Sequence, residues 1–158
     1  MVYNTDKDFM ARAIELSINN IKNGGGPFGA VIVRDGNIVA EGFNQVTTNN
    51  DPTAHAEVNA IRNACQTLGT FDLSGCEIYT SCEPCPMCLS AIYWARLDKI
   101  YFANTKIDAD NIGFSDQFIY DEIEKAPQDR QIPTTTLMRN EAIKAFEAWE
   151  NKTDKIEY

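Results

Sequence analysis

Apolar residues recur at three- and four-residue steps over residues 8–22 and again over 52–68. This spacing is typical of amphipathic helices that bury one face. Asp51 and Pro52 suit the start of the second helix, because Asp caps free N–H groups and Pro is tolerated in the first turn. Residues 86–96 are apolar nearly all round, which predicts a third helix packed on several sides.

Short apolar runs bounded by turn residues predict five strands, at residues 28–34, 37–42, 76–81, 99–103 and 134–137. Asp35 and Gly36 are expected to join the first two strands as a hairpin. Helical spacing returns over 114–123 and 140–149, with a connecting arm at 126–133. Strands that alternate with helices indicate an α/β sheet covered on both faces, and the length favours one domain over residues 1–158.

Two short segments carry the residues with the most distinctive chemistry. They supply His55, which is the only histidine in the sequence, together with Glu57 and the close thiol pair Cys85 and Cys88. One imidazole and two thiols suit Zn²⁺, and three ligands rather than four leave a position open for water. An open zinc site beside a carboxylate is the arrangement of a hydrolytic enzyme.

The spacing of these residues limits how they can converge. Cys85 and Cys88 are three positions apart, so both thiols face one side of the third helix, near its N-terminus, where the helix dipole stabilises thiolate. His55 and Glu57 are two positions apart, and such residues splay by about 200° on a helix. Glu57 can therefore reach the metal only at the mouth of a helix. The sequence also matches the zinc deaminase signature, His-x-Glu followed by Pro-Cys-x-x-Cys.

Other interpretations of the same residues need different partners. A redox Cys-x-x-Cys pair needs no His-x-Glu upstream, and a structural zinc site normally has a fourth ligand. Cys82 is the nearby candidate for that ligand, whereas Cys65 and Cys76 suit a helix stripe and a buried strand. A zinc-stabilised binding protein would keep the thiol pair but has no use for Glu57.

Charge narrows the choice of substrate. Acidic residues outnumber basic ones by 23 to 14, which gives a formal net charge of −9. A protein that grips nucleic acid usually carries a basic surface, so we expect a small uncharged substrate and no nucleic acid. No apolar run is long enough to span a membrane, and residues 1–6 lack the features of a signal peptide. We therefore expect no membrane partner and a cytoplasmic location.

Several longer segments carry a family resemblance, namely 26–33, 50–57, 79–88, 91–96, 113–120 and the closing Glu157 and Tyr158. In these segments the chain resembles the cytidine deaminase-like superfamily and, more closely, the bacterial guanine deaminases within it. The earlier segments are shared with purine and tRNA deaminases, whereas 113–120 and the terminal tyrosine separate the guanine group. The resemblance implies a three-layer α/β/α fold around a central mixed five-stranded sheet.

The resemblance also implies a reaction, the hydrolysis of guanine to xanthine and ammonia in purine catabolism. It implies one Zn²⁺ per chain, with ligands His55, Cys85 and Cys88. Glu57 would carry protons, and Asp116 would be an auxiliary proton carrier near the leaving amine. The residues implied to bind or enclose the purine base are Phe28, Asn44, Ala56, Trp94 and Tyr158. A homodimer is implied as well, in which residues 127–158 form an exchanged C-terminal arm.

Several alternatives stay open at this stage. Guanosine or another small aminated heterocycle fits the same zinc chemistry. A tRNA adenosine deaminase shares the zinc segments, but it needs a cationic surface that a net charge of −9 disfavours. Asp116 could instead cap a helix, Trp94 could be a core residue, and Tyr158 could be a loose terminus.

Overall fold

The computed structural model describes residues 5–158, which form two compact units. The first unit ends at Asp116, and the second comprises Gln117–Tyr158. Both candidate segments for zinc binding lie in the first unit. Within residues 5–158, no helix combines the length and apolarity that a membrane crossing requires.

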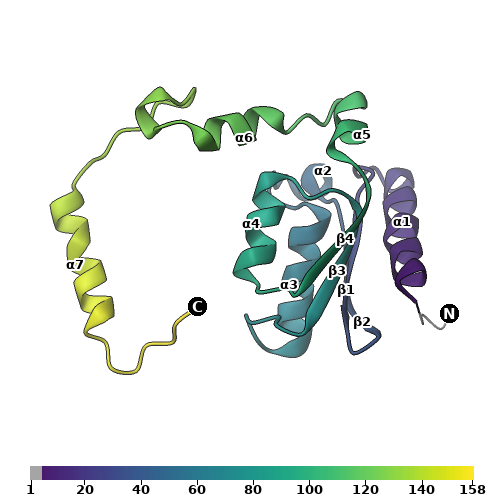
Figure 1. Cartoon of the computed structure of the whole chain (residues 1–158), viewed down its shortest axis with the longest axis horizontal. Helices are drawn as coiled ribbons and strands as arrows, with labels where there is room; N and C mark the ends of the chain where they lie inside the picture. The colour runs from purple at the N-terminus through teal and green to yellow at the C-terminus, as the bar shows by residue number, and fades with distance from the viewer. Residues whose placement is uncertain (1–4) are drawn as a thin grey trace. The chain divides into compact units, whose positions relative to one another are not determined.

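A mixed four-stranded sheet forms the centre of the first unit (Figure 1). Its strands are β1 (Gly29–Arg34), β2 (Asn37–Phe43), β3 (Cys76–Cys82) and β4 (Lys99–Asn104), in the order β2-β1-β3-β4. β1 is antiparallel to both of its neighbours, whereas β3 and β4 are parallel. The first two strands are joined at Asp35 and Gly36, as predicted, and both residues have positive φ.

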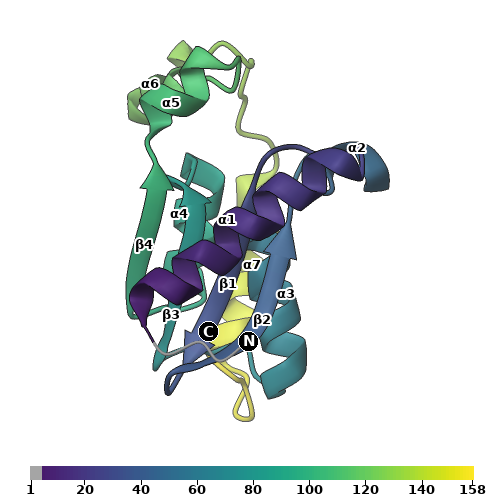
Figure 2. The same ribbon diagram turned by 90° about the vertical axis from the view of Figure 1, so that its right-hand side faces the viewer.

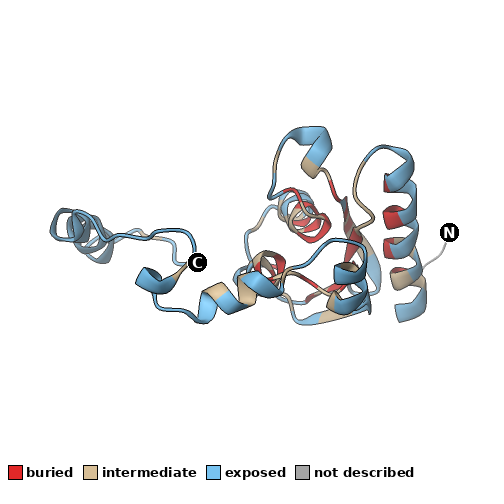
Figure 3. Cartoon of the chain, turned by 90° about the horizontal axis from the view of Figure 1, so that it is seen from above, coloured by how far each residue is buried: buried red, intermediate tan, exposed pale blue. Residues whose placement is uncertain are grey.

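Helices cover both faces of this sheet (Figures 1 and 2). The helices of the first unit are α1 (Asp6–Lys22), α2 (Val46–Asn49), α3 (Ala56–Leu68), α4 (Pro86–Trp94) and α5 (Lys106–Asn111). Side chains alternate along β1, so Ala30 and Ile32 pack toward α3 and α4 while Val31 packs toward α1. The buried residues gather between these helices and the sheet (Figure 3). The α/β prediction is confirmed, with helices on both faces of a mixed sheet.

Gly42 brings α3 close to β2. A Cβ atom added at Gly42 would lie 2.3 Å from the carbonyl oxygen of Ala56 and 2.4 Å from the amide nitrogen of Ala60. Both atoms belong to the helix backbone, so a larger residue would push the helix away from the sheet. This close approach fixes the N-terminal end of α3, which carries His55 and Glu57.

The second unit consists of α6 (Gln117–Glu124), the short 3-10 helix η1 (Pro127–Asp129) and α7 (Arg139–Glu150). None of its residues is buried. Its large exposed apolar side chains include Phe118, Ile132, Leu137, Phe146 and Trp149. This unit therefore forms no apolar core of its own.

The structure corrects the predicted start of the second helix. α3 begins at Ala56, not at Asp51 or Pro52. The Asp51 carboxylate instead accepts hydrogen bonds from the backbone nitrogen and the hydroxyl of Thr53, at 2.8 and 2.7 Å. This local turn satisfies the carboxylate before a helix can form. His55, rather than Asp51, is consequently the residue that precedes the helix.

The predicted five-stranded sheet is also wrong, because the sheet has four strands. Residues 134–137 are exposed and form no strand. A short segment such as this becomes a strand only by hydrogen bonding to a neighbouring strand, and no strand among residues 5–158 pairs with it. The short helices α2 and α5 lie in segments for which no helix was predicted.

Candidate active site

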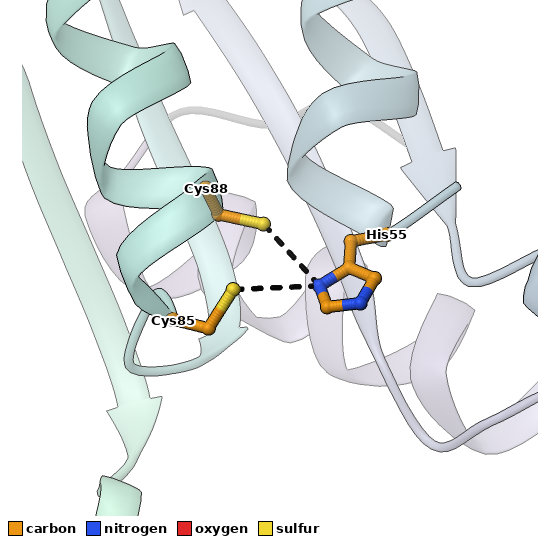
Figure 4. Close-up of side chains that lie close together, drawn as sticks. All are labelled: His55, Cys85 and Cys88. Atoms are coloured by element: carbon orange, nitrogen blue, oxygen red, sulfur yellow. Dashed lines mark hydrogen bonds between the residues drawn. The ribbon is translucent and has the colours of Figure 1, made fainter. Parts of the chain in front are cut away.

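Two helix N-termini meet on one side of the sheet and bring the candidate metal ligands together (Figure 4). His55 is the N-cap residue of α3, and Cys85 is the N-cap residue of α4. Pro86 occupies the first turn of α4, where its missing N–H removes no helical hydrogen bond. Cys88 lies inside the same first turn and is completely buried. The two thiols therefore share one helix end, as their spacing predicts.

The distances between these three side chains fit a tetrahedral zinc ion. The Nδ1 atom of His55 lies 3.5 Å from the Sγ atom of Cys85 and 3.5 Å from that of Cys88. A tetrahedral centre with bonds of about 2.0–2.1 Å to nitrogen and 2.3 Å to sulfur separates these atoms by about 3.5 Å. Two thiolates and a neutral imidazole also balance the charge of Zn²⁺. The donor set and its spacing fit zinc with one coordination position left for a non-protein ligand.

The thiols of Cys85 and Cys88 differ in pKa. The hydrogen bond from Cys88 lowers the pKa of Cys85 to about 4, and His55 acts in the same direction. The same contact, together with burial, raises the pKa of Cys88. The interaction with Cys85 raises the pKa of His55. A thiol that coordinates zinc loses its proton. Zinc binding would therefore release any proton that His55, Cys85 and Cys88 share.

Glu57 is buried beside these ligands. Its side chain is 5% exposed, and burial raises the pKa of its carboxyl group. One carboxylate oxygen lies 3.3 Å from the Sγ atom of Cys88, and the other accepts a hydrogen bond from the Thr80 hydroxyl at 3.1 Å. Because His55 is the N-cap and Glu57 is in the first turn, the backbone bends between them. That bend overcomes the splay expected from their spacing.

Thr80 is a site residue that sequence reasoning missed. It lies on β3 and is 1% exposed. Two acceptors compete for its one hydroxyl proton, the Glu57 carboxylate and the carbonyl oxygen of Cys82, both at 3.1 Å. A thiolate at Cys88 cannot donate to Glu57, so Thr80 remains to orient the carboxylate. The available signal was the strand period, which places Thr80 on the same face as Ile78, toward α3.

Replacing Thr80 by valine is expected to lower kcat about tenfold, because the Glu57 carboxylate loses a charge-assisted hydrogen bond. Valine keeps the shape of threonine, so KM and zinc content should stay unchanged. Thr80→Ser keeps the hydroxyl and is the matched control, with turnover close to that of the wild type. Steady-state kinetics with zinc analysis checks the prediction. Equal turnover in Thr80→Val and wild type would contradict an orienting role.

Four other residues predicted for the site, Phe28, Asn44, Ala56 and Asp116, also belong to the first unit. Ala56 is the first residue of α3 and is fully buried. Asn44 follows β2 and is 8% exposed. Phe28 packs edge-to-face on Phe114, with ring centroids 5.0 Å apart. Burial raises the pKa of Asp116, and the charge of Cys85 raises it further, so Asp116 lies near enough to the metal ligands to interact with them electrostatically.

Trp94 and Cys82 lie outside this group of residues, whereas Tyr158 is in the second unit. Trp94 is the last residue of α4, at the opposite end of the helix from Cys85, and its side chain is 70% exposed rather than part of the core. Tyr158 belongs to the second unit and is 74% exposed. Cys82 is not in the metal-binding group, and burial raises the pKa of its thiol to about 11.

The fold and the site define a class of protein. Residues 3–104 match the cytidine and deoxycytidylate deaminase zinc-binding region, so the chain belongs to this family of zinc-dependent deaminases. Within the family it is similar to guanine deaminase from Bacillus subtilis (strain 168), with 54% identity over 151 residues, which cover 95% of this chain and 97% of the relative. An X-ray structure of guanine deaminase from Bacillus subtilis matches with a TM-score of 0.95 and 53% identity, over 98% of this chain and 99% of that one.

More distant relatives cover less of the chain. Guanine deaminase from Nitrosomonas europaea matches in structure with a TM-score of 0.71 and 34% identity, over 73% of this chain and 68% of that one. The tRNA-specific adenosine deaminase of Aquifex aeolicus is 41% identical over 60% of this chain and 63% of the relative. The tRNA-specific adenosine deaminase of Buchnera aphidicola subsp. Schizaphis graminum covers more, 91% of this chain, but at 32% identity.

Proposed function

We propose that this protein hydrolyses guanine to xanthine and ammonia. The observation that carries the proposal is the buried Glu57 carboxylate, 3.3 Å from Cys88, beside three residues that could hold zinc. A tetrahedral zinc site with three protein ligands keeps one position for water. Similarity over nearly the whole chain to guanine deaminase from Bacillus subtilis supports the choice of base. Removal of an amino group from guanine is a step of purine catabolism, and we place the enzyme in the cytoplasm.

The residues present supply the groups that hydrolytic deamination needs. His55, Cys85 and Cys88 would hold zinc, which supplies the Lewis acidity that makes water nucleophilic near neutral pH. Glu57 accepts a proton from water as oxygen bonds to the ring carbon that carries the amine. It passes this proton to the adjacent ring nitrogen. It then accepts the remaining proton of the hydroxyl group formed on that carbon and passes it to the departing amine. The carbon–nitrogen bond breaks, and the nitrogen leaves as ammonia.

Other residues would hold the base in place. Asn44 and the backbone of Ala56 have hydrogen-bonding groups suited to the purine edge, while Phe28 would cover one of its faces. Trp94, at the other end of α4 from Cys85, is not part of this enclosure. Asp116 would assist protonation of the amine, since its raised pKa favours a carboxyl group that can donate a proton. Tyr158 would close the site. These roles rest on the family resemblance together with the burial of Asn44 and Ala56.

A panel of guanine, guanosine, adenine, cytosine and cytidine, assayed for ammonia release, tests the function. We expect turnover of guanine. Turnover of guanosine but not of guanine would show that the substrate is the nucleoside rather than the base. Turnover of cytidine alone would show that the substrate is not a purine. An adenosine-containing tRNA anticodon stem-loop belongs in the same assay, because tRNA-specific adenosine deaminases are among the relatives of this chain.

We further propose a homodimer in which residues 127–158 of each chain pack on the partner. The support is the second unit itself, where Phe146 is 74% exposed, Leu137 is 83% exposed and no residue is buried. Apolar surface of this extent normally packs against other protein surface. Together with the first unit, the arm would complete the single deaminase domain of residues 1–158. Light scattering on the purified protein measures the mass and tests the dimer.

Deleting residues 156–158 is expected to lower deamination about tenfold while zinc content stays at one ion per chain, because the deletion removes the group that closes the site. The comparison is made by steady-state assay and metal analysis. Tyr158→Phe keeps the ring and removes the hydroxyl, so it separates the enclosing role from hydrogen bonding. Full activity in the truncated protein would rule out the closing role of Tyr158.

A further inference from the structure

A buried amide in α1, that of Asn20, has no role in the chemistry described above. Asn20 is 5% exposed, although it carries a polar side chain. A buried amide is stable only when its hydrogen-bonding groups have partners. The partners of Asn20 lie in two segments that carry proposed substrate-binding residues.

Asn20 bridges the loop before β1 and the end of β2. Its Nδ2 atom donates to the carbonyl oxygen of Gly26 at 2.7 Å and to that of Asn44 at 2.8 Å. The two Nδ2 protons are therefore both used. The fit around this amide is tight, because a Cβ atom added at Gly25 would lie 2.4 Å from Nδ2.

Two backbone hydrogen bonds close this bridge into a ring. The Phe28 nitrogen donates to the Gly26 oxygen at 2.9 Å, and the Asn44 nitrogen donates to the Phe28 oxygen at 3.1 Å. Asn20 thus joins both ends of a segment that contains Phe28 and Asn44. The Asn44 side chain is oriented as well, since its Oδ1 accepts from the Val46 nitrogen at 3.2 Å. That bond directs the Nδ2 protons of Asn44 elsewhere.

We propose that Asn20 is a positioning residue for substrate binding, which sets the places of Asn44 and Phe28 through this ring of hydrogen bonds. The inference rests on the proposed function, because it takes these two residues as contacts of the purine base. The side-chain hydrogen bonds of Asn20 go to Gly26 and Asn44 and not to His55, Cys85 or Cys88. Without the amide, the carbonyl oxygens of Gly26 and Asn44 lose their shared donor, and the segments that carry Phe28 and Asn44 lose a link that holds them together.

Removing the Asn20 amide tests the proposal. Asn20→Ala is made in the Glu57→Gln background, and guanine binding to the zinc-loaded protein is measured by calorimetry. The dissociation constant is expected to rise about tenfold, which corresponds to the loss of one good hydrogen bond. Zinc content should stay at one ion per chain. Asn20→Ser, which keeps one hydroxyl donor, is measured in parallel and replaces the alanine variant if that variant does not fold.

The matched control is Asn63→Ala. Asn63 lies on α3 and donates through Nδ2 to the carbonyl oxygen of Glu41 at 2.8 Å, and that acceptor is a residue of β2 rather than Gly26 or Asn44. The variant removes a hydrogen bond of the same type, from a helix asparagine amide to a backbone carbonyl, and it should leave guanine binding unchanged. A second comparison adds Asn44→Ala. If Asn20 acts through Asn44, the double variant binds guanine more tightly than the product of the two single effects predicts.

The outcomes separate this inference from the proposed function. If the wild-type enzyme releases no ammonia from guanine, the proposed function fails. If it does so, but the Asn20 variants bind guanine as tightly as their parent, only the positioning role fails. The positioning role also fails if the fold-change in dissociation constant of the double variant equals the product of the two single fold-changes. It fails as well if Asn63→Ala weakens guanine binding as much as Asn20→Ala does.

Discussion

Replacing Glu57 by glutamine is expected to lower kcat by about 10²–10⁴-fold, the range associated with general acid–base catalysis. Glutamine keeps the size of the side chain but cannot accept and return a proton. The carboxylate is buried, with one oxygen 3.1 Å from Thr80 and the other 3.3 Å from Cys88. The variant should keep the fold, since an amide can still accept the Thr80 hydrogen bond. It should also keep zinc, because Glu57 is not among the three ligands of the metal-binding group.

The Glu57 prediction is checked by ammonia release and by metal analysis of the same preparation. Glu15→Gln makes the same chemical change on the exposed surface of α1 and is the matched control, with expected turnover close to wild type. A zinc-stabilised binding protein has no need of a proton carrier. Unchanged turnover in Glu57→Gln would therefore refute the hydrolytic mechanism. Loss of zinc from this variant would instead make Glu57 a structural residue.

Removal of the metal is the second change with a large expected effect. Dialysis against a strong chelator should abolish deamination, and added Zn²⁺ should restore it. The physical reason is that His55, Cys85 and Cys88 carry no nucleophilic water by themselves, whereas zinc lowers the pKa of water by several units. Cys88→Ser should produce the same loss through a changed ligand. Turnover is followed by ammonia release and occupancy by elemental analysis.

Cys65→Ser is the control for the cysteine variant. Cys65 lies on α3 outside the metal-binding group, and burial raises the pKa of its thiol, which disfavours thiolate. This variant should retain one zinc ion per chain and normal turnover. Full activity after complete removal of zinc would show that the spacing of the two thiols serves another purpose. Equal loss of zinc in both cysteine variants would point to general destabilisation.

The prediction of secondary structure succeeded where local pattern and burial agree. β1 is apolar in an unbroken run and is buried over Gly29–Val33, so it has one stable arrangement. The helical spacing also predicted α1, but Ile14, Ile18 and Ile21 of that pattern are exposed, and the buried apolar residues are Phe9, Ala13 and Leu16. The prediction failed where two local preferences compete. Asp51 can cap a helix or form a turn with Thr53, and the structure has the turn. Residues 134–137 suit a strand in isolation, but a strand exists only with a partner, and none lies beside this segment within residues 5–158.

The residues that carry the chemistry of the site can be identified from short segments of the sequence. His55, Glu57, Cys85 and Cys88 are identified by residue type and spacing, because a metal selects its ligands by softness and number. These residues specify a zinc-dependent removal of an amine before any fold is known. Their convergence needed the structure, since 30 positions separate His55 from Cys85 along the chain. Two helix N-termini on one face of the sheet bring them to 3.5 Å.

The hydrogen-bonding partners around those ligands follow from tertiary packing instead. Thr80 and Asn20 look like ordinary strand and helix residues. The strand period places Thr80 on the face toward α3, but no motif in the sequence identifies Glu57 or Asn44 as the hydrogen-bonding partners. Their hydrogen bonds join residues 23 and 24 positions apart, at distances that only the packing of α1 and α3 on the sheet establishes. Residue type and spacing in the sequence therefore determine which reaction the site can catalyse. The folded arrangement carries the orientation of the groups that perform it, because a hydrogen bond depends on distances between segments that are remote in sequence.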